Sequence, residues 1–234
     1  PMGLGAIDFA INNEKKPKLL IVTDINQERL ERAASIYTVE DAARKGIKLV
    51  YVNTSDPDKG VEYLLSFTDG KGYDDVFVFA PVAPVIEMGD KLLAYDGCLN
   101  FFAGPTRPDF YANFNFYNVH YNATHLVGTS GGNTEDLLIS LDMMGKGLIN
   151  PASMVTHIGG LNCVPETVLN LPNIPGGKKL IYTNIDLELT AISDFREKGK
   201  TDPLFAELAD IVEKNNGLWS AEAEKYLLKH AKSI

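Results

Sequence analysis

The sequence predicts an α/β protein built on a doubly wound parallel sheet, with further helices toward its C-terminus. Short apolar runs alternate with helical stretches between residues 3 and 146, and such alternation is typical of βαβ units. The runs are apolar almost without interruption, as strands buried on both faces of a parallel sheet are. Right-handed crossovers then place helices on both faces of the sheet.

The first predicted element is a helix over residues 3–11. Leu4, Ile7 and Ile11 share one helix face, which Asp8 interrupts, and Pro1 suits the start of a helix. The same alternation gives the elements that follow. We expect strands at 18–24, 47–53, 75–80, 98–103 and 124–128, helices at 25–35, 38–45, 58–67, 84–95 and 133–146, and a long loop with a short helix at 107–121.

The alternation weakens after Asn150-Pro151. Prolines break up the region 159–177, and a short strand follows at 179–183. Two helices come next. The helix over residues 203–215 has Asp202 as its N-cap, and the one over residues 220–231 has Ser220 as its N-cap. We expect these helices to cover the sheet. The predicted domains are residues 1–150 and residues 151–234.

Composition argues against several classes of partner. The chain carries 31 acidic and 22 basic residues, so neither nucleic acid nor an anionic membrane surface is expected as its main partner. No apolar run approaches the ~20 residues of a membrane span. The two cysteines, Cys98 and Cys163, are too few for a disulfide framework and suit a reducing compartment, so we expect a cytoplasmic protein.

The start of the chain has the spacing of a Rossmann-type dinucleotide-binding unit. Gly3 opens a helix, and Asp24 ends the next strand about 20 residues later, where a carboxylate reaches the adenosine ribose. That carboxylate accepts hydrogen bonds from both ribose hydroxyls and repels a 2′-phosphate. It therefore predicts NAD rather than NADP as the cofactor. The other interpretation of Asp24 is a strand-end residue that caps the following helix.

Several segments carry a family resemblance. They are Pro1–Ala6, the acidic-basic stretch Asp24–Ala33, Thr68–Val76 and the strand 97–104, with Val155–His157 in addition. They resemble segments of medium-chain, zinc-type alcohol and polyol dehydrogenases. In order, these are the end of the GxGPxGLxA turn, the D-x4-R-L-x2-A stretch, the T-x-G-x-G-x-D-x-V segment, the glycine-flanked strand and the segment after the last Rossmann helix. Two departures are Cys98 in place of a second glycine, and Ala80–Pro84 where that family has a glycine.

The resemblance implies a function shared with a second domain. It implies hydride transfer between nicotinamide and a polyol or sugar phosphate, for example L-sorbose 1-phosphate or glucitol 6-phosphate. In that family an N-terminal domain holds the catalytic zinc through Cys, His and an acidic residue. We therefore expect that domain, and the first Rossmann strand, to precede Pro1, and we expect no catalytic residue and no metal ligand in this chain. The resemblance also implies a homo-oligomer paired through the edge of the sixth Rossmann strand.

Ligands of open α/β sheets bind at the carboxyl ends of the strands, and this rule selects the candidate cofactor-binding residues. Arg29 is added because it lies one turn into the helix after Asp24, where it would stack on adenine or meet a phosphate, or else be a solvated helix charge. By resemblance, backbone groups of Phe102, Ala103 and Thr129 hold the nicotinamide carboxamide. The full candidate set is Met2, Gly3, Asp24, Ile25, Arg29, Ala80, Pro81, Phe102, Ala103, Gly104, Thr129 and Ser130.

Some alternatives stay open at this point. The glycine-rich loop 128–132 is either a phosphate-binding turn before a helix or a flexible connection. His120 and His125 have no carboxylate at metal-ligand spacing, which argues against a metal site. At the level of function, a Rossmann-like transferase that uses another adenosine ligand and a non-enzymatic nucleotide-binding domain both fit the same pattern of elements.

Overall fold

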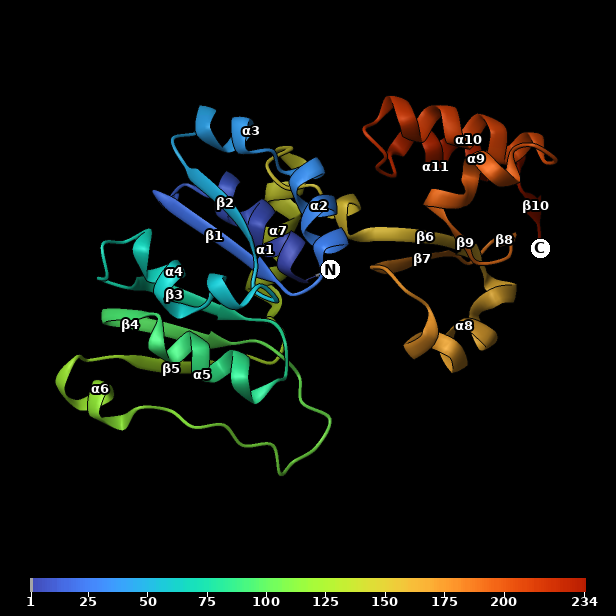
Figure 1. Ribbon diagram of the computed structural model, residues 1–234. Coiled ribbons are helices and arrows are strands. Elements are labelled where there is room, and N and C mark those ends of the chain that lie inside the picture. Colours follow the sequence, from blue (N-terminus) through green and yellow to red (C-terminus); the bar gives the residue numbers. More distant parts are fainter. Residues whose placement is uncertain (1) are drawn as a thin grey trace. The chain divides into compact units, whose positions relative to one another are not determined.

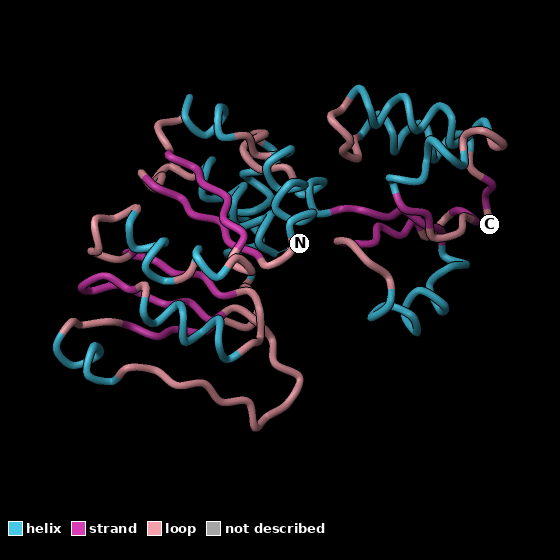
Figure 2. Tube along the Cα trace, viewed as in Figure 1, coloured by secondary structure: helices cyan, strands magenta, loops and turns pink. Residues whose placement is uncertain are grey.

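The computed structural model describes residues 2–234 (Figures 1 and 2), so the predicted position of Pro1 at the start of a helix lies outside the described residues. The chain divides into two units. Unit 1 contains residues 2–17, 36–38 and 143–234, and unit 2 contains residues 18–35 and 39–142.

Unit 2 holds two parallel sheets. The first pairs β1 (Leu19–Asp24) with β2 (Lys48–Asn53), so that Asp24 lies opposite Asn53. The second has the order β3-β4-β5, formed by Tyr73–Val78, Leu93–Phe101 and His125–Gly128. These strands confirm the parallel α/β architecture, and their register places Val78, Phe101 and Gly128 side by side at the carboxyl ends.

The helices of this region connect the strands as predicted. The helix α5 (Ala83–Lys91) packs against β3 and β4 (Figure 1). The predicted helix 84–95 is too long, because Leu93 pairs with Tyr73 and so begins β4. The bounds are α2 Gln27–Ile36, α3 Val39–Arg44, the short 3₁₀ turn η1 Pro57–Lys59, α4 Val61–Ser66, α5 Ala83–Lys91, α6 Phe116–Tyr121 and α7 Thr134–Gly145.

The helix α4 links the two sheets of unit 2. Its Leu64, which is 1% exposed, belongs to one apolar cluster with Val52 of β2. Ile21 of β1 and Val76 of β3 pack against the same cluster. Among the described strands, β1 pairs with β2 alone and β3 with β4 alone. A doubly wound sheet without its central strand has this arrangement, since the first strand of the order 3-2-1-4-5-6 lies between the second and the fourth.

Unit 1 begins with α1 (Met2–Asn12), whose predicted apolar face is confirmed. Ile7 and Ile11 are 5% and 3% exposed. Asp8 is buried with them, but its carboxylate accepts hydrogen bonds from the Asn150 N–H at 2.6 Å and from the Asn12 amide at 2.9 Å. A buried carboxylate is tolerated when it is hydrogen-bonded in this way, so Asp8 interrupts the pattern without leaving an unsatisfied charge.

A mixed sheet of order β7-β6-β9 forms the centre of unit 1. The last two long helices begin at the predicted N-caps, since Asp202 accepts from the Leu204 N–H and Ser220 from the Ala223 N–H. The strands are β6 Val155–Gly160, β7 Lys178–Tyr182, β8 Ile185–Asp186, β9 Thr190–Ala191 and β10 Lys232–Ser233, and the helices are α8 Val164–Asn170, α9 Phe195–Lys198, α10 Pro203–Lys214 and α11 Ala221–His230. Short 3₁₀ turns lie at Pro151–Met154, Leu161–Cys163, Leu171–Asn173 and Ile192–Asp194.

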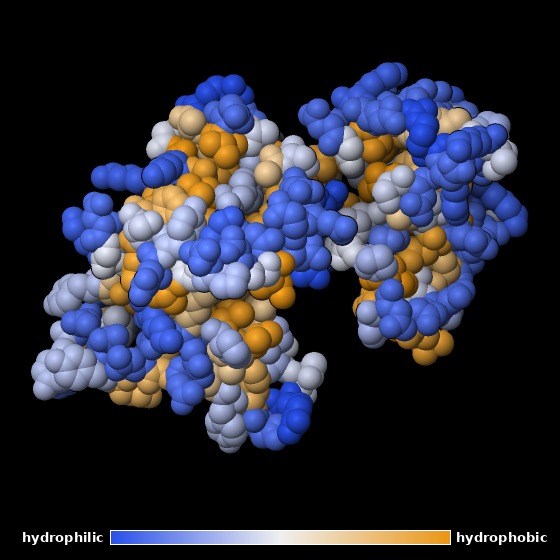
Figure 3. Space-filling model, in the orientation of Figure 1, coloured by the Kyte–Doolittle hydropathy of each residue, from blue (hydrophilic) through white to orange (hydrophobic). Residues whose placement is uncertain are grey.

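The helices α10 and α11 cover this mixed sheet. Leu208 and Leu227 are fully buried in one cluster with Ile158 of β6. Leu208, Ile211 and Val212 therefore form a packing face of α10. In Figure 3 hydrophilic residues cover much of the drawn surface, and hydrophobic residues show between them. Within residues 2–234, each helix is too short or too polar to cross a membrane.

Candidate cofactor site

The carboxyl edge of the β3-β4-β5 sheet brings together candidate residues from three strands. Ala80 and Pro81 follow β3, the segment Phe102–Gly104 follows β4, and Thr129 and Ser130 follow β5. The N–H groups of Phe102 and Ala103 both donate to the Val78 carbonyl, at 3.0 and 3.1 Å. The turn after β4 is thereby fixed against the end of β3.

Asp24 ends β1, and its carboxylate keeps hydrogen-bonding capacity. Its Oδ1 accepts the Asn26 N–H at 2.9 Å, and its Oδ2 lies 3.9 Å from Nη1 of Arg29. A carboxylate offers about four acceptor positions, and the Asp24 side chain is 31% exposed. The helix α2 is capped instead by Asn26, whose Oδ1 accepts the Arg29 N–H at 3.0 Å. Asp24 is therefore not the N-cap of α2.

The other candidate residues, which lie next to Asp24 or at the start of α1, differ in exposure to solvent. Ile25 is 70% exposed next to Asp24. The Arg29 side chain is 74% exposed. Met2 and Gly3 open α1 in unit 1, where Met2 is 41% exposed and a Cβ on Gly3 would meet no atom within 4 Å.

Two acidic side chains of α5 hold the long loop that follows β4. Glu87 Oε1 accepts hydrogen bonds from the Asn113 backbone N–H at 3.1 Å and from its side-chain amide at 2.7 Å. Asp90 Oδ2 accepts the Asn115 N–H at 3.0 Å. The Asn113 N–H lowers the pKa of Glu87, whereas burial raises the pKa of Asp90. Ring stacking of Phe101 on Phe110 adds a third attachment.

Neither these loop-holding residues nor two polar groups near the strand ends are among the residues predicted from the sequence. Asn100 is the one polar residue inside the apolar run at the end of β4, and its buried Oδ1 has no hydrogen-bond partner among the described residues. Asn53 ends β2 beside Asp24 and accepts hydrogen bonds from Ser55. In the sequence, both residues stand out as polar side chains within or at the end of an apolar run.

The loop 128–132 before α7 is not an open anion site. Asn133 Oδ1 accepts the Asp136 N–H at 3.0 Å, and Asp136 Oδ2 accepts the Asn133 N–H at 2.7 Å. This reciprocal capping box satisfies backbone donors that an anion would otherwise bind. The Asp136 carboxylate would also repel a phosphate, so the interpretation as a structural connection is favoured.

Residues 2–234 contain no group of three His, Cys, Asp or Glu side chains placed to hold a metal ion. His125 lies 2.9 Å from Asp96, and both cysteines are free thiols. The zinc site of the resembled family therefore does not fit the described side chains.

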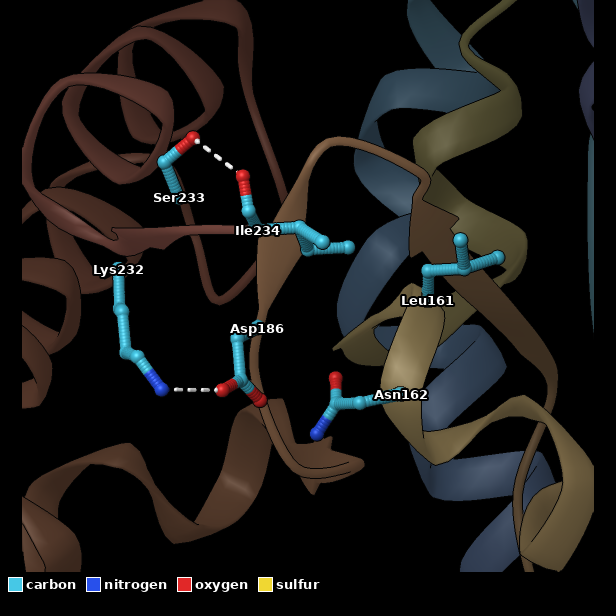
Figure 4. Close-up of a pocket in the computed structure, with 6 residues that line it drawn as sticks. All are labelled: Leu161, Asn162, Asp186, Lys232, Ser233 and Ile234. Atoms are coloured by element: carbon cyan, nitrogen blue, oxygen red, sulfur yellow. Dashed lines mark hydrogen bonds and ion pairs between the residues drawn. The ribbon is translucent and has the colours of Figure 1, made fainter.

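A surface pocket of about 440 Å³ lies in unit 1 (Figure 4). Its only ammonium group, that of Lys232, is already paired with Asp186 at 2.7 Å. Asn162 uses its Oδ1 to accept the Leu187 N–H. The pocket thus offers few free polar groups, and it is lined by Leu161, Asn162, Asp186, Lys232, Ser233 and Ile234.

Comparison with known proteins identifies the family. Residues 1–146 match the model of the zinc-binding dehydrogenase family. The chain is 56% identical over 229 residues to mannitol-1-phosphate 5-dehydrogenase of Aliivibrio fischeri, and 45% identical over 234 residues to L-sorbose 1-phosphate reductase of Klebsiella pneumoniae. These matches cover 98% and 100% of this chain but 54% of each relative, so the chain spans about half the length of these curated relatives.

Solved structures show the same fold at low sequence identity. The 2R,3R-butanediol dehydrogenase of Bacillus subtilis superposes with a TM-score of 0.61 at 18% identity, over 79% of this chain and 48% of that one. A short chain alcohol dehydrogenase of Escherichia coli in complex with NADH gives a TM-score of 0.57 at 16% identity, over 77% of this chain and 48% of that one.

Proposed function

Because the chain belongs to the zinc-binding dehydrogenase family, we propose that it forms the cofactor-binding part of an NAD-dependent oxidoreductase acting on a polyol or sugar phosphate. The observation that carries the proposal is the shared carboxyl edge of β3, β4 and β5, where three candidate segments meet. Ligands of open parallel sheets bind at this edge.

The residues present fit a dinucleotide. Asp24 has the free acceptor positions that ribose hydroxyls need, and the buried Oδ1 of Asn100 is an unpartnered acceptor near the end of β4. Around the nicotinamide we assign the turns Ala80-Pro81, Phe102–Gly104 and Thr129-Ser130, and around the adenosine Ile25 and Arg29, which flank Asp24. By resemblance to the glycine-rich turn of the family, we also assign Met2 and Gly3 to the cofactor. When bound, NAD supplies the hydride acceptor, and these residues orient it.

The same carboxylate supports a preference for NAD over NADP. A 2′-phosphate at the adenosine ribose would be brought close to the ionised Asp24 and lose its own solvation. Arg29 is the one cation within 4 Å of the Asp24 carboxylate among the described residues, at 3.9 Å, and its side chain is mostly solvated. It offsets that repulsion only weakly, since exposed ion pairs contribute about 0–1 kcal/mol.

The substrate class is drawn from the names of the relatives. Two of them are named for mannitol 1-phosphate and L-sorbose 1-phosphate, and glucitol 6-phosphate is a further substrate of this kind. We assign zinc binding to a part of those longer proteins that this chain does not span. Within the chain we assign residues 1–150 to the Rossmann domain. We assign residues 151–234 to a segment that returns to the catalytic domain, followed by helices that cover it.

Two free thiols support a cytoplasmic location, and the exposed strand β5 supports a homo-oligomer.

Substitution of Asp24 tests the cofactor assignment. Asp24→Asn in the full-length protein should weaken NADH binding about tenfold or more, because a hydrogen bond to a charged group contributes about 1.5–3 kcal/mol. It should also lower the ratio of the NADPH dissociation constant to the NADH dissociation constant. Fluorescence titration of both cofactors measures this, and oxidation of mannitol 1-phosphate with NAD tests the reaction itself.

The matched control is Asp58→Asn, which alters an exposed carboxylate after β2. It should leave both dissociation constants unchanged. Equal NADH affinity of Asp24→Asn and the native protein would contradict the assignment. Binding of S-adenosylmethionine in preference to NADH would instead favour a Rossmann-like transferase, and cofactor binding without turnover of any polyol would favour a non-enzymatic binding domain.

A further inference from the structure

The loops at the carboxyl edge of the β3-β4-β5 sheet carry a single cation. Between each of these strands and the helix that follows lie residues 79–82, 102–115 and 129–133. Arg107 is the one Lys, Arg or His residue in these three segments. An anionic substrate group that reaches this edge therefore has one positively charged side chain of the described loops to meet.

The loop that carries Arg107 is attached at both sides of that residue. Before it, the N–H groups of Phe102 and Ala103 bind the Val78 carbonyl. After it, Phe110 stacks on Phe101, and the acceptors on α5 bind Asn113 and Asn115. A segment held in this way presents its side chains from a restricted position, which lowers the entropy lost on ligand binding.

The Arg107 guanidinium is already in a fork geometry. Its Nε donates to Asp109 Oδ1 at 2.9 Å and its Nη2 to Asp109 Oδ2 at 2.5 Å. Phosphate oxygens take the same bidentate arrangement. The pair is solvated, with the two side chains 77% and 55% exposed. Exposed ion pairs contribute little to stability, so exchange of the Asp109 carboxylate for a phosphate dianion costs little.

We propose that Arg107 binds the phosphate group of a phosphorylated polyol, with Asp109 occupying the guanidinium until the substrate arrives. The proposal rests on the proposed function and adds a specificity-determining residue to it. It makes Arg107 responsible for the distinction between a polyol phosphate and the free polyol, and it makes Asp109 a competitor of the substrate.

The test compares substitutions of both partners in the full-length protein with NADH present. Arg107→Gln should raise the calorimetric dissociation constant of mannitol 1-phosphate at least tenfold. Asp109→Asn should lower it, because the competing carboxylate charge is gone. The KM for mannitol 1-phosphate should follow the same order, while the KM for mannitol and the dissociation constant of NADH stay within twofold of the native values.

The matched control is Arg44→Gln, since Arg44 forms a similarly exposed ion pair with Asp41 on α3. It should change none of these constants. Native-like binding of mannitol 1-phosphate by Arg107→Gln would overturn the proposal, as would a loss confined to NADH affinity, or native protein that does not bind mannitol 1-phosphate. Turnover by the native protein separately decides the proposed function, because the calorimetric comparison does not depend on it.

Discussion

His157 shows how single residues in β6 are tied to their surroundings. It is 8% exposed, and its Nδ1 lies 2.9 Å from the Thr156 hydroxyl, which itself accepts the Gly177 N–H at 2.8 Å. Burial, followed by the positive charge of Lys179, lowers the pKa of His157, and Asp194 acts in the opposite direction. The folded protein therefore favours the neutral imidazole.

The lowered pKa of His157 predicts a pH dependence of stability. Below about pH 6.5, the ordinary value for histidine, the unfolded chain binds a proton that the folded chain resists, so the free energy of unfolding falls as the pH drops. His157→Gln removes this titration, and its loss of stability between pH 7 and pH 5 should be smaller than that of the native protein. Urea denaturation at both pH values measures the difference.

The control for this prediction is His230→Gln, at an exposed position on α11. It should keep the native pH dependence, because the substitution leaves His157 and its surroundings unchanged. If His157→Gln and the native protein lose the same free energy of unfolding on acidification, burial of His157 is not the cause of that loss.

At the scale of elements, the turn before β3 explains the T-x-G-x-G part of the motif at residues 68–76. The Thr68 hydroxyl donates to the Leu65 carbonyl and accepts the Gly72 N–H at 3.1 Å. Gly70 and Gly72 have φ angles of +77° and +83°, which favour glycine. A Cβ on Gly72 would lie 2.7 Å from backbone atoms of Leu93 and Ala94, whereas one on Gly70 would meet no atom within 4 Å.

This difference predicts unequal effects of two alanine substitutions. Gly70→Ala should cost about 1 kcal/mol for its left-handed backbone conformation alone. Gly72→Ala should cost about 2 kcal/mol more, because β4 must also shift away from the new methyl group. Chemical denaturation of both variants gives the comparison. Equal destabilisation would mean that β4 yields to the methyl group without cost.

The elements also show where sequence patterns were sufficient. The parallel strands and their helices in unit 2 were predicted because each apolar run is continuous and is bounded by turn residues. The strand β6 and the helix α8 were not predicted, since prolines usually interrupt regular structure. Pro165 lies in the first turn of α8, where its missing N–H costs nothing. The two-residue strands β8, β9 and β10 arise from long-range pairing and have no local signal.

The candidate site was predictable to the same extent. The strand-end residues followed from a general rule of parallel sheets. Ala80, Phe102 and Thr129 do come after β3, β4 and β5, and their contact with a cofactor stays a prediction. Glu87 and Asp90 hold partners 26 and 25 residues away, and such tertiary hydrogen bonds leave no periodic trace in the sequence. The distinction between Asp24 and Asn26 as the cap of α2 likewise needed coordinates, because both residues are good N-caps.

At the scale of the whole molecule, one edge of the β3-β4-β5 sheet is suited to pairing with a partner. The strand β5 ends the β3-β4-β5 sheet and pairs on one side alone among the described strands. Its Leu126 and Val127 are 52% and 42% exposed. An unpaired edge with apolar side chains is a template for pairing with another chain. Twofold antiparallel pairing of β5 with a second copy would continue the sheet through the proposed homo-oligomer.

This arrangement predicts that a lysine on β5 disrupts assembly. In a twofold pairing, Leu126→Lys places two ammonium groups on the same face of neighbouring strands, where like charges are destabilising. The dissociation constant of the full-length dimer should rise at least about tenfold, as measured by sedimentation. Leu169→Lys is the control, because it alters a leucine that is 82% exposed on α8. Assembly as strong in Leu126→Lys as in this control would place the interface elsewhere than at β5.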